Sequence, residues 1–131
     1  MRKIVYFKSE KFKPFLPNEV QVNPNVYGAE LAFWLAEKLA EKGVVTSYPD
    51  YEDWGWYLNY TPTEEDEFLL CCSNEDGEAN SWICFLQLEF GVLFWKRKSN
   101  MSKAKPLLDA LKSILEESKE ILDVEWKMKQ I

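Results

Sequence analysis

The spacing of hydrophobic and polar residues along the chain predicts two amphipathic helices. The first is expected from about Val26 to Lys42, because Asn23-Pro24-Asn25 offers capping residues before it and Gly43 ends it. Its apolar face consists of Leu31, Ala32, Leu35, Ala36 and Leu39. The second begins near Pro106, a residue that a helix tolerates only in its first turn. Its apolar face consists of Leu107, Leu108, Leu111, Ile114 and Leu115.

Short apolar runs bounded by turn residues predict the strands of a sheet. They are Arg2–Lys8, Gly43–Tyr48, Trp54–Tyr60, Glu67–Cys72, Ser81–Leu88 and Ile121–Lys127. The sequence Asn74-Glu75-Asp76-Gly77 is typical of a hairpin turn between the fourth and fifth runs, and Val92–Trp95 would add a short strand. The last run either closes the sheet, with Val124 and Trp126 on one side, or prolongs the second helix.

Strands that follow one another between two helices are typical of α+β proteins. The expected fold is a single-layer, mainly antiparallel sheet of five or six strands with both helices packed on one face. With 131 residues, of which 47% are hydrophobic, the chain is large enough to bury a core and small enough for one domain, residues 1–131.

Trp34 lies on the polar side of the first predicted helix. It falls between Glu30 and Glu37, with Tyr27 above it, away from the leucine face. Two interpretations fit this position. Either another segment covers the tryptophan, such as the one around residues 15–16, or the side chain is exposed aromatic surface of the kind that marks binding sites.

The charges are segregated along the chain. Between Lys42 and Lys96, no lysine or arginine occurs in 53 positions, whereas eleven carboxylates do. The flank up to Lys42 carries seven basic residues against five acidic ones, and the flank from Lys96 carries nine against six. The net charge of −6 therefore conceals a polarised molecule, whose acidic part would steer positively charged partners. Alternatively, basic residues of the flanks fold back over the central acids.

The residue types present exclude several kinds of chemistry. The chain has no histidine, which rules out Ser-His and Cys-His nucleophilic pairs and histidine-containing zinc sites. Its three cysteines cannot form a structural zinc site alone, and adjacent Cys71 and Cys72 point to opposite faces of a strand, as a core thiol and a surface thiol. The usual phosphate-binding glycine loops are missing. We therefore expect no catalytic residue, cofactor or metal ion.

Composition also limits partners and compartment. Direct nucleic-acid binding is disfavoured, because phosphates need lysine or arginine and the middle of the chain has neither. The cluster Lys96-Arg97-Lys98, with Lys103 and Lys105, either meets an anion or is a solvated turn. A sparse, odd number of cysteines fits a reducing compartment, and no membrane-spanning run or signal peptide is recognisable. The expectation is a cytoplasmic protein without membrane contact, and the oligomeric state is left open.

The most distinctive local sequence is Tyr48-Pro49-Asp50-Tyr51-Glu52-Asp53-Trp54-Gly55-Trp56, which places three acids among four aromatic residues. As a site, its carboxylates and ring faces would grip a cationic group, or its three acids would hold a divalent cation. As a structural feature, it is an acidic turn in which one of the tryptophans anchors the core and Gly55 lets the strand bend or pack closely.

This motif is part of a wider resemblance. Together with Asn25-Val26-Tyr27-Gly28 at the start of a helix and Asp123-Val124-Glu125-Trp126 near the end, it resembles a family of small uncharacterised bacterial and phage proteins. The likeness extends over most of the chain and is specific at the sequence Glu52-Asp53-Trp54-Gly55-Trp56. It implies the same order of elements and a prokaryotic or phage origin, and it implies no activity.

The leading hypothesis is a non-catalytic, acidic interaction protein that binds a basic protein surface. The partner would be a nucleic-acid-processing defence system that the protein inhibits, or a toxin that it neutralises as an immunity protein. The expected partner-binding residues are Asp50, Glu52, Asp53, Trp54, Trp56, Glu64, Glu65, Asp66, Glu67, Tyr27 and Trp34. The alternative is an enzyme that binds a small molecule or a metal ion and uses Glu52 and Asp53 in an aromatic pocket.

Overall fold

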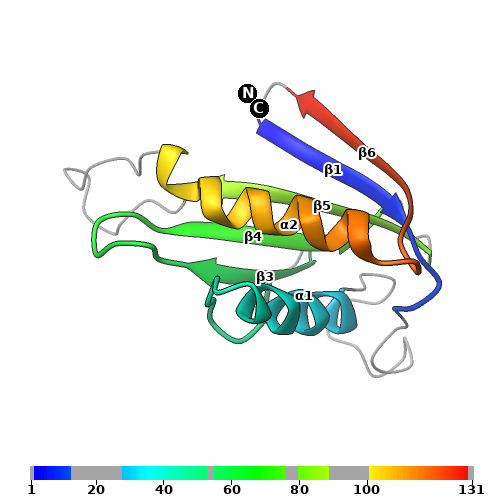
Figure 1. Cartoon of the computed structure of the whole chain (residues 1–131), viewed down its shortest axis with the longest axis horizontal. Coiled ribbons are helices and arrows are strands. Elements are labelled where there is room, and N and C mark those ends of the chain that lie inside the picture. The colour runs from blue at the N-terminus through cyan, green and yellow to red at the C-terminus, as the bar shows by residue number, and fades with distance from the viewer. Residues whose placement is uncertain (1, 13–27, 53–54, 76–79, 89–100, 130–131) are drawn as a thin grey trace.

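The structure, a computed structural model, describes residues 2–12, 28–52, 55–75, 80–88 and 101–129 (Figure 1). Its elements are β1 (Arg2–Lys8), α1 (Ala29–Glu41), β2 (Asp50–Glu52), β3 (Gly55–Tyr60), β4 (Phe68–Asn74), β5 (Ser81–Leu88), the short 3-10 helix η2 (Met101–Ala104), α2 (Lys105–Glu117) and β6 (Leu122–Lys129). Of the helices that the structure describes, none has the length and apolar composition needed to cross a membrane.

Six strands form one antiparallel sheet in the order β2-β3-β4-β5-β1-β6. β1 lies between β5 and β6, so the first strand along the chain is an interior strand of the sheet. Among the described strands, β2 and β6 are the outermost of this sheet. The predicted α+β fold with a single antiparallel sheet and two helices is thereby confirmed.

Both helices cover the same face of the sheet, and the hydrophobic core lies between the two layers (Figure 1). Alternate strand residues point into it, as the two-residue period of a strand requires. They include Val5, Phe7, Leu58, Phe68, Leu70, Cys72, Trp82 and Cys84. The helices add Leu31, Leu35, Leu39, Leu107, Leu111, Ile114 and Leu115. Burying a large apolar side chain contributes about 1.5–3 kcal/mol, so this cluster is the main source of stability.

Most predicted strands are present, with small changes at their ends. β4 and β5 form the predicted hairpin, and the Glu75 N–H donates to the Ser81 carbonyl at 2.8 Å where the two strands separate. Residues 122–129 form a strand and do not prolong α2. The predicted helix start at Val26 and the short strand at 92–95 lie outside the described residues.

The predicted strand Gly43–Tyr48 is wrong. The Val44 N–H donates to the Leu39 carbonyl at 2.9 Å, which closes the end of α1 instead of joining the sheet. The Ser47 N–H does reach the carbonyl of Asn59 on β3, at 2.9 Å. Residues 44–49 are nevertheless an extended connection, and the strand begins only at Asp50. The apolar side chains that suggested a buried strand mostly face outward in this connection, as described below.

Two glycines stand where another residue would be strained. Gly43 ends α1 with a φ of 83°, and a Cβ at this position would meet no atom within 4 Å. Gly55 begins β3 with a φ of 153°, and its Cβ would lie 2.7 Å from the Cys72 carbonyl oxygen. The close approach of β3 to β4 therefore needs a glycine at position 55, as the sequence indicates.

Gly55→Ala should lower the free energy of unfolding by about 2–3 kcal/mol, because strained backbone and a clash with β4 act together. Gly43→Ala is the matched control, since it has the backbone strain without the clash and should cost about 1 kcal/mol. Urea denaturation of the two variants and the parent measures both values. Equal losses in the two variants would show that the contact with β4 does not require the glycine.

Candidate binding site

A groove lies between the solvent side of α1 and the extended connection of residues 45–49. Its volume is about 630 Å³. Phe33 and Trp34 of α1 form part of its lining, and Val45 and Tyr48 of the connection form another part. The lining also includes Ala36 and Ala40, whose small side chains leave the helix surface low between larger neighbours. We refer to this hollow as the α1 groove.

The α1 groove exposes large hydrophobic side chains. Phe33 is 48% exposed, Val45 72% and Tyr48 87%. Single exposed apolar residues are ordinary on protein surfaces, but several gathered in one hollow are typical of a place where another molecule binds. Sequence reasoning found Trp34 and missed Phe33. The available signal was the pair of adjacent aromatic residues on the polar side of α1, close to two alanines.

Trp34 connects the α1 groove to the core. It is partly buried, and its ring lies 5.2 Å from the ring of Phe12, measured between centroids. Phe12 in turn packs edge-on against Trp82 at 5.7 Å. Both interpretations of Trp34 therefore hold in part. Phe12 covers one part of its side chain, and the remaining part lines the α1 groove. The covering residue on view is Phe12, while residues 15–16 lie outside the described part of the chain.

Carboxylates lie at the border of the α1 groove. Glu30 and Glu37 project from α1 and are exposed. The exposed strand β2 continues directly from the connection, which brings Asp50 next to the groove in the chain. One basic residue, Lys11, also borders the hollow, but it forms a salt bridge with Glu120 at 3.6 Å. An acidic border around an apolar hollow favours a ligand that is both cationic and apolar.

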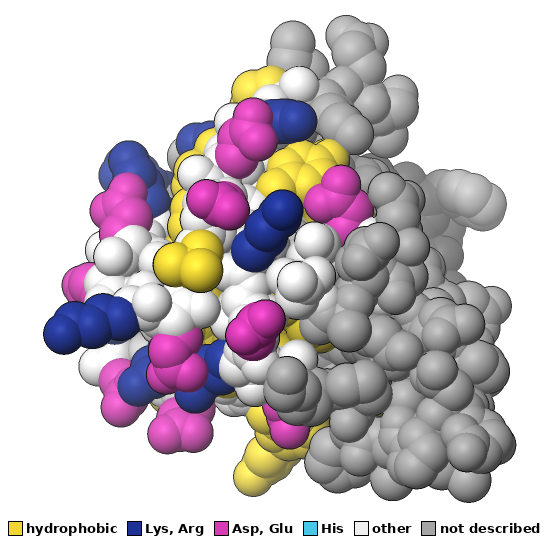
Figure 2. Space-filling view, turned by 90° about the vertical axis from the view of Figure 1, so that its right-hand side faces the viewer, with side chains coloured by type: hydrophobic (Ala, Val, Ile, Leu, Met, Phe, Trp, Pro, Cys, Tyr) yellow, Lys and Arg dark blue, Asp and Glu magenta, His cyan; other side chains and the backbone are white. Residues whose placement is uncertain are grey.

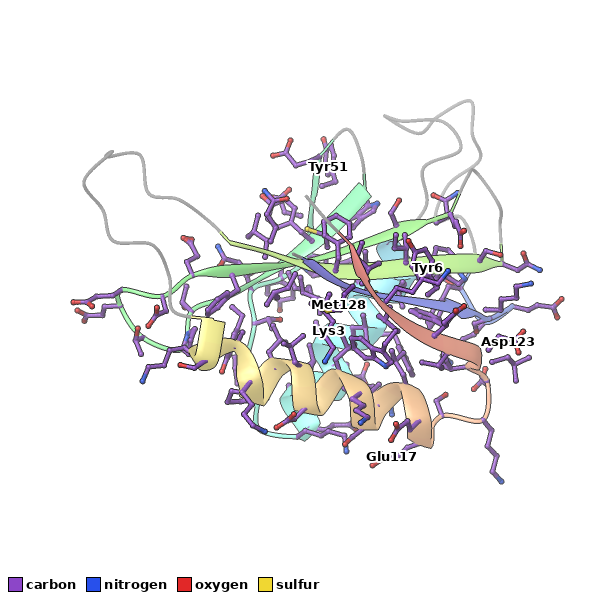
Figure 3. All side chains as sticks on the ribbon, turned by 90° about the horizontal axis from the view of Figure 1, so that it is seen from above. Lys3, Tyr6, Tyr51, Glu117, Asp123 and Met128 are labelled. Atoms are coloured by element: carbon purple, nitrogen blue, oxygen red, sulfur yellow. The ribbon has the colours of Figure 1, made fainter. Side chains whose placement is uncertain are left out.

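Part of the acidic motif, Asp50–Glu52, forms the strand β2. All three residues of β2, including Asp50 and Glu52, are exposed. Tyr51 lies opposite Trp56 of β3, with ring centroids 5.4 Å apart, at the sheet edge labelled in Figure 3. Trp56 is partly buried and packs against the core, as its structural interpretation expects. The predicted site residues Tyr27, Asp53 and Trp54 lie outside the described residues.

The second acidic group, Glu64 to Glu67, divides into exposed and structural residues. Glu64 and Glu65 are exposed in the loop between β3 and β4. Asp66 is buried, and its Oδ2 accepts a hydrogen bond of 2.7 Å from the Thr63 hydroxyl. Its role is therefore to hold the loop, which removes it from the candidate partner surface. Glu67 is partly buried and accepts a hydrogen bond of 3.2 Å from the Asn59 side chain.

Salt bridges in the described part of the chain pair residues of the two flanks. Lys42 of α1 meets Glu117 of α2 at 3.2 Å, and Lys105 meets Asp109 one helical turn on at 2.6 Å. Figure 2 shows the same mixing, since acidic and basic side chains alternate over the described part of that face. Exposed pairs of this kind contribute about 0–1 kcal/mol each. None of these pairs includes a carboxylate from positions 43–95.

The cysteines are buried free thiols. Cys72 and Cys84 face each other across β4 and β5 with their sulfur atoms 3.8 Å apart. The contact with Cys84, together with burial, raises the pKa of the Cys72 thiol well above its usual range. Cys71 points to the opposite face of the sheet and is nevertheless fully buried, so the expected surface thiol is wrong. Buried, protonated thiols are poor nucleophiles and poor metal ligands.

The remaining enzyme alternative requires carboxylates in a concave aromatic pocket. Glu52 is exposed on an edge strand and is not among the residues that line the α1 groove. Within the described ranges, no group of three Cys, Asp or Glu side chains is placed to hold a metal ion. The two carboxylates on which the enzyme alternative depends are therefore not placed together in the α1 groove: Glu52 does not line it, and Asp53 lies outside the described residues.

Comparison of the chain with protein-family models, with curated proteins and with solved structures finds no match.

Replacing Trp34 and Phe33 one at a time should distinguish a residue that stabilises the core from a residue that only lines the α1 groove. Trp34→Ala should cost about 2 kcal/mol, roughly half of the 3–5 kcal/mol typical of a fully buried tryptophan, because only part of the ring is covered. Phe33→Ala, at the neighbouring exposed position, should stay within about 0.5 kcal/mol of the parent. Thermal and urea unfolding provide the measurement. A Trp34→Ala variant as stable as the parent would contradict the contact with Phe12.

Thiol labelling tests the placement of the cysteines. A chromogenic disulfide reagent at neutral pH should leave all three thiols of the folded protein unmodified, because they are inaccessible and, at Cys72, protonated. In denaturant, the same reagent should titrate all three. Rapid labelling of one thiol in the native protein would contradict this placement, and its loss in Cys71→Ser would assign the accessible thiol to Cys71.

Proposed function

We propose that this protein is a non-catalytic binding protein that takes up an apolar segment of a basic partner protein in the α1 groove. The observation that carries this proposal is the gathering of Phe33, Val45 and Tyr48 in one hollow with carboxylates at its border. Aromatic side chains in a partly enclosed hollow are the usual anchors of protein interfaces. Because the net charge of the chain is −6, its electrostatic potential attracts a positively charged partner.

The chemistry of the groove defines the ligand. A large apolar side chain of the partner would enter between Phe33 and Val45 and pack against Trp34. Lysine or arginine residues on either side of it would lie near Glu30 and Glu37. The apolar contacts would supply most of the affinity, while the acidic surroundings would raise the association rate and suppress acidic competitors.

Exposed acidic residues outside the α1 groove add to the negative electrostatic potential of this surface. They are Asp50, Glu52, Glu64 and Glu65. Proteins that process nucleic acids carry basic surfaces, because they must neutralise phosphates. An acidic protein that occupies such a surface competes with the nucleic acid, and the proposed role is that of an inhibitor of a nucleic-acid-processing defence system. Neutralisation of a basic toxin by an immunity protein would use the same surface chemistry.

Three synthetic peptides of equal length test the ligand class. One is an amphipathic peptide of lysine and leucine, one replaces leucine by serine, and one replaces lysine by glutamate. Isothermal titration should detect binding of the lysine-leucine peptide only, and raising the salt concentration should weaken it. Failure of that peptide to bind, or equal binding of all three, would contradict the proposal.

Variants locate the site on the protein. Phe33→Ser should weaken binding of the lysine-leucine peptide about tenfold or more while leaving the melting temperature almost unchanged. The double variant Glu30→Lys/Glu37→Lys should slow association and reduce the salt dependence. Glu64→Lys/Glu65→Lys changes the net charge equally but lies outside the groove, so it is the matched control. If this control weakens binding as much as the groove variant does, the peptide is bound by the general field and not by the α1 groove.

A further inference from the structure

β6 is the last strand of the sheet in the order of the described strands, so its outer side is an edge. Its pairing with β1 is regular from Glu125 to Lys129. An irregularity occurs only at its start, where the register shifts and Asp123 adopts a φ of 53°. Unpaired backbone N–H and C=O groups along a regular edge are a template for another strand.

The order of charged residues along β6 suits antiparallel pairing with the β6 strand of a second copy. An antiparallel copy centred on Trp126 would place Glu125 opposite Lys127 of the second copy, and Val124 opposite Met128. Each of these pairs occurs twice, because a two-fold axis repeats every contact. Opposite charges and apolar pairs are the favourable cross-strand neighbours in antiparallel sheets.

Neighbouring registers that also place the helix-covered faces of both copies on the same side have less favourable charge pairs. A two-fold centred on Glu125 places two glutamates against each other, and one centred on Lys127 places two lysines against each other. Like charges directly opposite each other destabilise a strand pair. Charged residues on an edge strand normally serve to prevent pairing with other strands. In β6, the charged residues would oppose every same-face register centred near the middle of the strand, except the register centred on Trp126.

The side chains of Glu125 and Lys127 in β6 are exposed, and the salt bridge that they form with each other, with Lys127 also over the Tyr6 ring, would be exchanged for bridges between the copies. Glu125 and Lys127 lie 3.7 Å apart on one face, and Met128 is 57% exposed on the other. On that second face Val124 and Trp126 pack against the core, so an apolar row extends from the core toward the edge. Met128 pairs with Lys3 of β1, and Figure 3 shows these two labelled residues close together.

We propose that a second copy of this chain binds along β6 in antiparallel orientation, about a two-fold axis at Trp126. The two sheets would join into one continuous sheet, with the helices of both copies on the same side. This surface lies at the opposite edge of the sheet from β2, so the inference does not depend on the proposed function of the α1 groove.

The dimer is expected to be weak, because one short strand pair buries little surface compared with a stable interface. Sedimentation equilibrium over a range from about ten micromolar to one millimolar should show a reversible rise of the mass from monomer to dimer. A monomer mass over the whole range would overturn the proposal.

Charge exchange tests the register. Glu125→Lys and Lys127→Glu should each weaken self-association about tenfold or more, because two attractive pairs become repulsive. Mixing these two variants should restore association, since the lysines of one face the glutamates of the other. The double exchange Glu125→Lys/Lys127→Glu should dimerise like the parent. Circular dichroism melts confirm that each variant is folded. Self-association of the single variants at the parent's strength would overturn the proposal, as would failure of the mixture to associate.

Discussion

The contact series Trp82–Phe12–Trp34 is the constraint on which both the core and the groove depend. Trp82 is fully buried on β5, and its indole N–H, which must be satisfied inside the protein, donates to the Ser9 carbonyl at 3.1 Å. That bond holds the chain beyond β1 against the sheet. Phe12 then fills the space next to Trp82, and Trp34 rests on Phe12. The position of α1 therefore depends in part on Trp82 of β5, through Phe12.

The sequence predicts most of the fold, because most elements bury one face and expose the other. Helical spacing identifies α1 and α2, and apolar runs identify β1, β3, β4, β5 and β6. The pattern fails at residues 43–48, where Val45 and Tyr48 are apolar but exposed. It also fails at Cys71, because alternation predicts solvent on the second face of a single sheet, whereas this part of that face is buried. In both places tertiary contacts, which a local pattern does not contain, decide the outcome.

The candidate site is less visible in the sequence than the fold is. The α1 groove exists because a connection packs beside α1, so Phe33 and Val45 become neighbours although twelve positions separate them. The acidic residues are easier to find and harder to interpret. Asp66 and Glu67 look identical to Glu64 and Glu65 in a charge count, yet the first two serve hydrogen bonds to Thr63 and Asn59. Only the exposed carboxylates contribute to a partner surface.

The position of β1 inside the sheet affects how the chain can fold while it is synthesised on the ribosome. β1 is synthesised before both of its neighbours, since β5 begins at Ser81 and β6 at Leu122. Contacts between positions so distant in sequence form late, because a long loop must close before they are made. Until β5 has been synthesised, the nascent chain therefore carries an apolar strand with neither of its neighbours. The sheet cannot be completed before β6 has been synthesised, and a nascent chain that exposes an apolar strand in this way is prone to aggregation.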